Sequence, residues 1–484
     1  MSLVWCWSTP VPSGPDEPAQ VIQAAAVVRG QVAGRTVSPS SPTTFVRVPA
    51  SIAALGTTPF RCDYTPTVSG ACEPRLPAQP SLVPSTTYVG HYPPLYYAVV
   101  GWPSLIDAGR LGVYGMRMVS ALVGAVLLGL AVAVAAATGN RLLVLAVAAG
   151  ITPDAIYLDA VVNPNGLEIA AATAAWAAAL ACLVVPGRPR RSLLAAFVAA
   201  EVVLAFTRPL SPGWAVGVVA VSAAVLPAPA RQAWRHRSVR VALGAVGAAV
   251  VVSGAYVLLA RSYLIERFPL PSGTSELTAF RMVVGAVGSW ADQMVGAFGA
   301  PDTAAPWLAM AVWGGGAMAL LAAVAVGFPP RARRTVIGLA LLWVVVLPVA
   351  ATSHDLRDAS IGASWHGRYG EPLAVSVPMV AAVLARTTRP VVERLARTVP
   401  VALAVGLAGT QLYVLRRYTV GMGGGLGLVP SGPGQWQPFA PALVLAAASV
   451  VTAAGWALLL RHVDGAAGAS VPGSAVPGPA ALSG

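Results

Sequence analysis

The chain has 484 residues, of which 56% are hydrophobic and only 10% are charged, and its mean hydropathy is +0.70. A soluble globular protein cannot bury so large an apolar fraction, so this composition excludes a soluble fold. The 31 residues counted as lysine or arginine are all arginine, and the formal net charge is +13. Because the arginines stand in short clusters between apolar segments, they indicate membrane topology and not nucleic-acid binding. We therefore predict an all-α polytopic membrane protein with the lipid bilayer as a partner and no nucleic acid.

The chain begins with an apolar segment that is too short to cross a membrane. Residues 1–7 lead directly into a polar region, and we interpret them as the outer end of a truncated first transmembrane helix. The alternative is a complete chain whose N-terminus lies outside. Residues 8–113 then form the predicted first extracytoplasmic loop, which we expect to contain interfacial helices.

Residues 114–461 are predicted to form the transmembrane bundle, because apolar segments recur at lengths near those needed to cross about 30 Å of hydrocarbon. We expect about eleven full transmembrane helices, at residues 114–137, 142–160, 167–185, 192–207, 212–228, 241–260, 306–327, 335–352, 372–386, 398–415 and 439–460.

Alternate connections between these helices carry the arginine clusters, which predicts that they face the cytoplasm of a bacterial plasma membrane. The arginines are Arg141, Arg188, Arg190, Arg191, Arg231, Arg235, Arg237, Arg240, Arg331, Arg333, Arg334, Arg386, Arg389, Arg394, Arg397 and Arg461. The longer connections 261–305, 353–371 and 416–438 then lie outside the cell, where we expect any binding or chemistry. Residues 462–484 are predicted to form a disordered cytoplasmic tail.

Two of the four cysteines lie in the first outer loop. Cys62 and Cys72 are separated by nine residues there, and an extracytoplasmic position favours a disulfide between them over two free thiols. Cys6 and Cys182 lie in apolar segments and are interpreted as packing residues.

The first candidate site is the pair Asp16 and Glu17, between Pro15 and Pro18. A carboxylate near the membrane surface is suited to act as a general base. Adjacent side chains point in different directions, so only one of the two is expected to face a site. The structural alternative is that Asp16 caps a helix over 18–29.

A second candidate closes the first outer loop, where His91 and Tyr92 precede Pro93. Prolines and tyrosines suit an interfacial helix over 93–106. That helix leaves His91 unexplained, and His91 is either a phosphate or acid ligand or a plain surface histidine.

A third candidate involves acidic residues within an apolar segment. Asp154 and Asp159 both fall there, and a carboxylate inside a membrane usually faces a partner or a watery cavity. Asp159 lies nearer the outer surface, with Arg117 as a candidate ion-pair partner. Structural pairing and function both remain open for this pair.

The fourth candidate lies at the outer end of a late segment. Arg368 presents a guanidinium suited to phosphate, and Trp365 or Tyr369 is suited to stack on a sugar; His366 stands between them. The alternative is an aromatic and arginine anchor at the membrane interface. The sequence has no nucleotide-binding or zinc-protease motif, and the histidines match no metal-ligand spacing, so a divalent metal is left open.

The order of these motifs resembles a bacterial family of predicted multi-pass membrane proteins that is similar to the GT-C superfamily of glycosyltransferases. The resemblance rests on Pro15-Asp16-Glu17, on residues 91–97 and on Gly367-Arg368-Tyr369, and it covers about residues 1–460. It implies a GT-C-like bundle, and an inverting transferase that moves a sugar from a polyprenyl-phosphate donor to a glycan, lipid or protein acceptor of the cell envelope.

The resemblance also implies roles for individual residues. Asp16 would be the catalytic base, with Glu17 as its substitute, and Arg368 would lie near the donor phosphate, assisted by Arg208 or Arg117. Gln20 stands where family members usually carry a histidine, which weakens a metal or proton-relay role there. Two other functions stay open, namely a transporter or flippase of lipid-linked glycans and a non-catalytic envelope-assembly scaffold.

Overall fold

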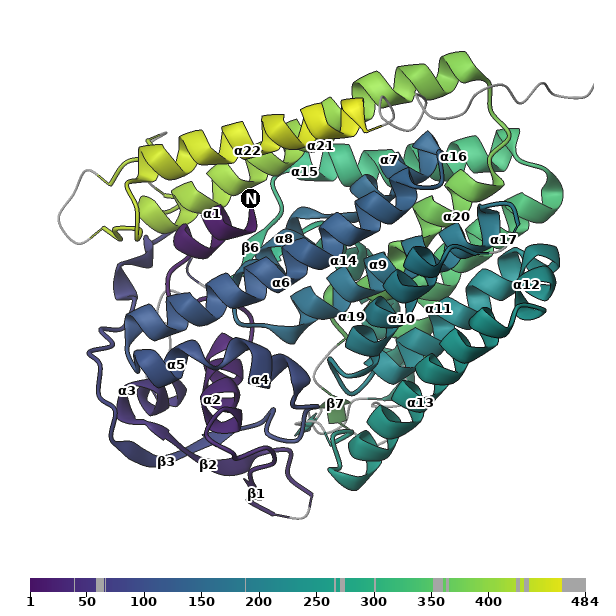
Figure 1. Cartoon of the computed structure of the whole chain (residues 1–484). Coiled ribbons are helices and arrows are strands. Elements are labelled where there is room, and N and C mark those ends of the chain that lie inside the picture. The colour runs from purple at the N-terminus through teal and green to yellow at the C-terminus, as the bar shows by residue number, and fades with distance from the viewer. Residues whose placement is uncertain are drawn as a thin grey trace, which may run out of the picture.

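The computed structural model describes most of the chain, namely residues 1–38, 40–57, 65, 67–187, 189–264, 267–269, 275–299, 302–350, 360–362, 365–423, 427–430 and 435–463. Helices dominate the described residues, and they pack into one bundle with a small lobe at one end of the helix α6 (Arg110–Ala136) (Figure 1). The predicted helical class is therefore confirmed at this level. Most of the predicted disordered tail lies outside the described residues.

The lobe is built from the predicted first outer loop and contains a sheet as well as short helices. Its helices are α2 (Glu17–Val27), α3 (Ala50–Ala53), α4 (Leu95–Val100) and α5 (Pro103–Ile106), with 3₁₀ turns at Ala54–Gly56 and Gly70–Cys72. The short helix α1 (Ser2–Trp7) lies outside the lobe and packs in the bundle, against α6 and α8 (Pro153–Ala160). The strands β1 (Arg35–Thr36), β2 (Thr44–Pro49) and β3 (Leu82–Thr87) pair antiparallel in the order β1-β2-β3. Interfacial helices were expected in this loop, and the sheet was not.

Local sequence explains both features of the lobe. In β2, Thr44, Val46 and Val48 are buried while Phe45 and Arg47 are exposed, which is the two-residue alternation of a strand with one face on a core. The predicted interfacial helix over 93–106 is present as the two short helices α4 and α5. Their separation follows from Pro103, which opens α5 and has no N–H to continue the hydrogen bonds of α4.

The bundle follows in chain order. Its helices are α6 (Arg110–Ala136), α7 (Arg141–Gly150), α8 (Pro153–Ala160), α9 (Pro164–Val184), α10 (Arg191–Ala205), α11 (Ser211–Val225), α12 (Pro227–Trp234), α13 (Arg237–Leu259), α14 (Glu276–Val295), α15 (Trp307–Ala309), α16 (Gly315–Gly327), α17 (Pro330–Leu341), α19 (Gly367–Ala374), α20 (Ser376–Leu384), α21 (Arg389–Thr419) and α22 (Ala442–His462). Single π-helical turns at Met310–Gly314 and Leu342–Val346 continue α15 into α16 and extend α17. Two small ribbons pair β4 (Arg267–Pro269) with β7 (Ser360–Gly362) and β5 (Ala297–Phe298) with β6 (Thr303–Ala304).

Among the described residues, seven helices are long and apolar enough to cross a membrane, or up to nine if each of two bent pairs is one span. The pairs are α7 with α8, bent by 59°, and α11 with α12, bent by 110°. The predicted number of eleven is thus not reached, because α10 has only 15 residues and the segment at 372–386 is divided between α19 and α20. Pro153 and Pro227 stand at the first turn after the two bends, where proline starts a new helix.

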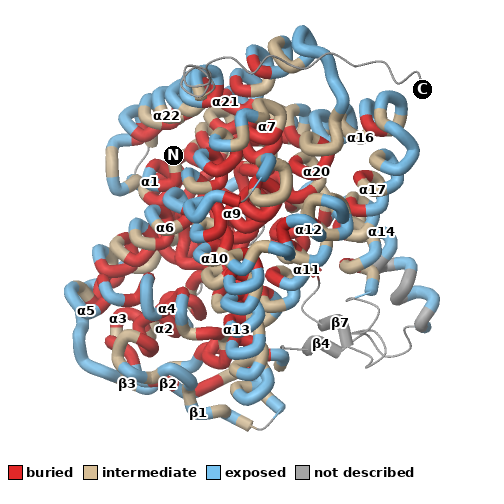
Figure 2. Tube along the Cα trace, turned by 45° about the vertical axis from the view of Figure 1, so that its right-hand side comes forward, coloured by how far each residue is buried: buried red, intermediate tan, exposed pale blue. Residues whose placement is uncertain are grey.

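Helix α9 forms the centre of the bundle. In its most apolar 18-residue window 83% of residues are buried, against 22% for α13 and 28% for α22, and Figure 2 shows the same contrast. Alanine occupies nine of its 21 positions, which lets α6 and α10 pack closely along it. The outer helices keep their apolar faces exposed, as expected where lipid covers them.

Part of the predicted arginine-rich face is assembled in the structure. Arg141 donates to the carbonyl of Arg461 at 3.1 Å, and Arg461 donates to the carbonyl of Arg397 at 2.9 Å. Three arginines from distant connections therefore lie on one face, as their alternation along the sequence predicts. Which side of the membrane this face occupies stays a prediction.

A buried ion pair attaches the lobe to the bundle. Arg117 of α6 donates Nε to Glu17 Oε1 at 2.7 Å and Nη2 to Glu17 Oε2 at 2.6 Å, and both side chains are 0% exposed. The same guanidinium donates to the carbonyls of Cys6, Thr9 and Pro10. Glu17 also accepts the backbone N–H groups of Gly14 and Val162, both at 3.1 Å, so each charge is fully hydrogen-bonded.

We predict that Arg117→Met lowers the free energy of unfolding by about 3–5 kcal/mol, because it leaves Glu17 charged and buried without a cation. Glu17→Gln combined with Arg117→Met should lose less than the two single variants add up to. Unfolding of the purified protein in detergent measures these losses.

The matched control is Arg389→Met, which breaks the ion pair with Glu393. That pair is exposed, at 90% and 42% of its two side chains, and is worth about 0–1 kcal/mol. Equal effects of the two arginine substitutions would contradict a role for the Glu17–Arg117 pair in holding the lobe.

Candidate functional site

The side chain of Asp16 connects three parts of the chain. Tyr88 Oη donates to Asp16 Oδ1 at 2.8 Å, and Arg368 Nη2 donates to Asp16 Oδ2 at 3.0 Å. Asp16 holds the N-cap position of α2, but its side chain makes no capping hydrogen bond. The structure therefore does not use Asp16 as the helix cap considered above. Its side chain is 36% exposed, whereas that of Arg368 is 7% exposed.

The neighbouring contacts fix the backbone that presents Asp16. Glu17 points away into the ion pair with Arg117, which confirms that the two adjacent carboxylates face in different directions. Asn163 Nδ2 donates to the carbonyl of Pro15 at 2.7 Å. Between these anchors Asp16 adopts φ 58°, a left-handed conformation that aspartate tolerates better than most residues and that clusters at functional sites.

Arg368 is held from the other side by the packing of α19 on α14. The Gly367 N–H donates to Gln293 Oε1 at 2.9 Å. A Cβ atom at Gly367 would lie 2.3 Å from the carbonyl oxygen of Trp290, so only glycine allows this close approach of the two helices. The glycine of the Gly367-Arg368-Tyr369 motif thus positions the arginine that follows it.

Two buried guanidinium groups lie against the ring of Tyr369. The Cζ of Arg208 is 4.8 Å from the ring centroid and the Cζ of Arg368 is 5.1 Å from it. Arg208 Nη1 also donates to Glu168 Oε2 at 2.9 Å. The Nε atoms of both arginines are buried and have no hydrogen-bond partner within the described residues. A buried N–H without an acceptor is unusual and accommodates an oxygen from a ligand.

Two more of the predicted residues surround Tyr369. Trp365 and His366 both contact its ring edge to face, with centroid distances of 5.9 and 5.5 Å. Burial and the positive charge of Arg368 lower the pKa of His366 to about 3. His366 is therefore neutral at physiological pH and adds no charge to the cluster.

His91 takes no part in the hydrogen bonds of Asp16 to Tyr88 and Arg368. It is buried, its Nε2 has no hydrogen-bond partner in the described part of the chain, and its burial lowers the pKa of the imidazole. Its backbone carbonyl accepts the hydroxyl of Ser262, and the carbonyl of Tyr92 accepts that of Tyr256 at 3.4 Å. These contacts attach the segment to the end of α13, so His91 is neither a plain surface histidine nor bound to Asp16.

Three predicted site residues lie elsewhere. Glu17 and Arg117 form the buried ion pair, so Arg117 is not the partner of Asp159, and the pairing considered for these two residues is wrong. Asp159 is 1% exposed, packs against Gly124 of α6 and has neither carboxylate oxygen hydrogen-bonded to a described residue. We retain Asp16 alone as the candidate base, because Glu17 has no exposed surface.

The cysteine and metal predictions are tested only in part. Cys6 and Cys182 are free thiols, as expected for packing residues. Cys62 lies outside the described residues, so the bridge to Cys72 stays a prediction. In the described part of the chain, no group of three or more His, Cys, Asp or Glu side chains is arranged to hold a metal ion, and His354 lies outside that part.

Sequence reasoning missed two residues of this site. Tyr88 directly follows β3, and no pattern in the sequence marks it as a partner of Asp16. Gln293 lies in α14, in a segment that was expected to be an outer loop. The ion pair of Glu168 with Arg208 joins α9 to the connection between α10 and α11, and it depends on how these parts pack.

We predict that His366 makes the protein less stable in acid. Its folded pKa lies below the usual value of 6.5, so the unfolded chain binds the proton more readily. The stability that neutral His366 contributes is fully present above pH 6.5 and is lost as the pH falls towards 3. His366→Gln should therefore flatten the fall in melting temperature between pH 6.5 and 4, while His462→Gln, at an exposed position on α22, should not. Parallel curves for the wild type and His366→Gln would contradict this.

The sequence has no match among curated proteins or among solved structures. Residues 1–377 match a family of membrane proteins, and this region includes every residue of the Asp16 and Arg368 cluster. Since the match covers more than half of the chain, the protein belongs to the family described as Predicted membrane protein (DUF2142).

Proposed function

We propose that the protein is a glycosyltransferase that moves a sugar from a polyprenyl-phosphate donor to a cell-envelope acceptor on the outer face of the bacterial plasma membrane. The observation that carries the proposal is the meeting of Asp16 and Arg368, which are 352 positions apart in the chain and 3.0 Å apart in space. The contact combines a half-exposed carboxylate with a buried cation. Transfer from a lipid phosphate needs this combination, because a base and a phosphate-binding group must act on one bond.

In the proposed reaction, Asp16 accepts the proton of an acceptor hydroxyl. The hydroxyl oxygen attacks the anomeric carbon from the face opposite the phosphate, and the bond from that carbon to the phosphate oxygen breaks. The electron pair leaves with the polyprenyl phosphate, and the anomeric configuration inverts. General-base catalysis of this kind contributes roughly 10²–10⁴-fold to the rate.

Arg368 and Arg208 would hold the phosphate of the donor. Each guanidinium has an Nε–H without an acceptor, and both lie on the ring of Tyr369. Cations that are buried before the substrate arrives stabilise the charge on a departing phosphate without reorganisation. The aromatic rings of Tyr369 and Trp365 would offer apolar faces to the sugar.

Asp16 must also lose its hydrogen bond to Arg368 before it can accept a proton. In the free protein the Arg368 guanidinium donates to Asp16 Oδ2 and so occupies one of the oxygens that would accept the proton. A phosphate that binds Arg368 competes for the same guanidinium and frees Asp16 to accept a proton. Tyr88 would keep the carboxylate in place during this exchange, since partial burial and the adjacent Asp16 carboxylate raise the pKa of its phenol and keep it a donor.

The surroundings of the site favour a substrate that lies in the membrane. Tyr92 is bonded to the end of α13, where Leu258 and Leu259 are 68% and 85% exposed. In α5 the apolar side chains of Leu105 and Ile106 are 56% and 80% exposed. Exposed apolar surface of this size on both sides suits contact with lipid, including the isoprenoid of a donor.

We predict that Asp16→Asn reduces sugar transfer by roughly 10²–10⁴-fold, because the amide keeps the shape of the side chain but cannot accept the proton. The measurement is release of free polyprenyl phosphate when the purified protein is incubated with labelled polyprenyl-phosphate sugars. The variant should retain the wild-type melting temperature within a few degrees.

The matched control is Asp292→Asn, which changes an exposed carboxylate of α14 that forms no ion pair with a described residue. It should transfer sugar at the wild-type rate. Wild-type transfer by Asp16→Asn would remove Asp16 from the mechanism. Movement of labelled lipid across liposomes without release of polyprenyl phosphate would favour a flippase instead.

A further inference from the structure

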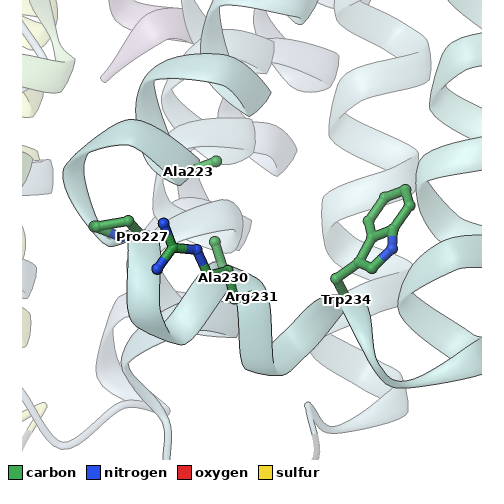
Figure 3. Close-up of a pocket in the computed structure, with 5 residues that line it drawn as sticks. All are labelled: Ala223, Pro227, Ala230, Arg231 and Trp234. Carbon is green, nitrogen blue, oxygen red and sulfur yellow. The ribbon is translucent and has the colours of Figure 1, made fainter.

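A second feature, remote in sequence from the Asp16 cluster, is the sharp bend between α11 and α12. At the bend, a shallow hollow of about 320 Å³ that is open to the outside is lined by Ala223, Pro227, Ala230, Arg231 and Trp234 (Figure 3). The four lining residues of α12 are spaced at i, i+3, i+4 and i+7, so they form one face of the helix. This face combines one cation, one indole and small apolar groups.

The opposite side of α12 is fixed to the bundle. Ala233 is buried and packs with Leu194 of α10 and with Val239 and Ala242 of α13. Arg240 of α13 donates to the carbonyls of Trp234 and Arg235, at 3.2 and 3.1 Å, and so satisfies the end of α12. The hollow is therefore a fixed part of the fold, and its open side faces away from the protein.

The charge around the hollow is entirely positive. No acidic residue occurs between Glu201 and Glu266, while Arg231, Arg235, Arg237 and Arg240 all fall in that interval. Arg231 is exposed and makes no ion pair or hydrogen bond with a described side chain. Its guanidinium is thus available to an anion that comes from outside the protein.

We propose that this hollow binds the phosphate headgroup of an anionic phospholipid from the bilayer that the protein spans. A guanidinium binds phosphate oxygens through two parallel charge-assisted hydrogen bonds. Trp234 is 56% exposed, and tryptophan favours the depth of lipid headgroups. Ala223, Pro227 and Ala230 give the apolar wall that the glycerol and the first acyl carbons of a lipid contact. Basic pockets between membrane helices are known to recognise anionic headgroups in this way.

The position of the hollow, as well as its positive charge, favours a lipid headgroup as the ligand. Helix α12 joins two predicted membrane helices and bends by 110° from the first of them, which places it across the bundle at the end where α11 stops and α13 begins (Figure 1). At that level the headgroups of the surrounding bilayer are the most concentrated source of phosphate. The proposal does not depend on the transferase function, because none of its residues contacts the Asp16 cluster.

The test uses the full-length protein in nanodiscs and counts retained lipids by native mass spectrometry. Nanodiscs that mix phosphatidylglycerol with phosphatidylcholine should give preferential retention of phosphatidylglycerol. Arg231→Gln should weaken that preference by about fivefold, which is the contribution of one arginine near an anionic surface. Trp234→Ala should weaken it in the same direction, and neither variant should change the melting temperature in phosphatidylcholine alone.

The matched control is Arg334→Gln, at an exposed arginine of α17 on a separate connection. Its retention of phosphatidylglycerol should equal that of the wild type. Equal losses for Arg231→Gln and Arg334→Gln would show only a diffuse attraction of lipid to the arginine-rich face and would overturn the site. Displacement of the retained lipid by millimolar inorganic phosphate would overturn the assignment of a lipid headgroup.

Discussion

The buried ion pair between Glu17 and Arg117 is the constraint on which the rest of the structure depends. Burying two charges costs several kcal/mol for each, so the pair is tolerated only where every lone pair and every N–H finds a partner. Here the partners are the backbone groups of residues 6, 9, 10, 14 and 162. The ion pair therefore ties the N-terminal segment to α6 and, through Glu17, to the junction of α8 and α9. It also fixes the backbone next to Asp16.

The side chain of Asp16 consequently points towards α19. The carboxylate meets Arg368, which is itself fixed by the contact of Gly367 with α14, and both are reached by Tyr88 or Tyr369. The site is thus assembled from three elements that are each held by packing at some distance from it. The carboxylate of Asp16 is partly exposed, whereas the two arginines beside it are buried and incompletely hydrogen-bonded. This combination suits the site to an anionic substrate with a reactive hydroxyl nearby.

Much of this arrangement could be predicted from the sequence, and the reasons differ between elements. Long helices such as α6 and α13 are visible because continuous apolar segments dominate their composition. Asp16 and Arg368 could be named because short motifs surround them. The partner of Arg117 could not be predicted, because Asp159 and Glu17 are equally plausible until the path of the lobe is known. Hydropathy gives no information on tertiary packing. It therefore could not predict the bends before Pro153 and Pro227 or the pairing of β2 with β3, which depend on that packing. Tyr88 was missed for the same reason, since only the sheet brings it to Asp16.

In the proposed mechanism, Asp16 and Arg368 face one site for a lipid-linked phosphate. An experimental map of the protein in a nanodisc with polyprenyl phosphate would test this placement. We expect phosphate density within hydrogen-bonding distance of the Arg368 and Arg208 guanidinium groups, with the Asp16 carboxylate beside it and released from Arg368. Phosphate bound at another place, or Asp16 and Arg368 on separate surfaces, would contradict it.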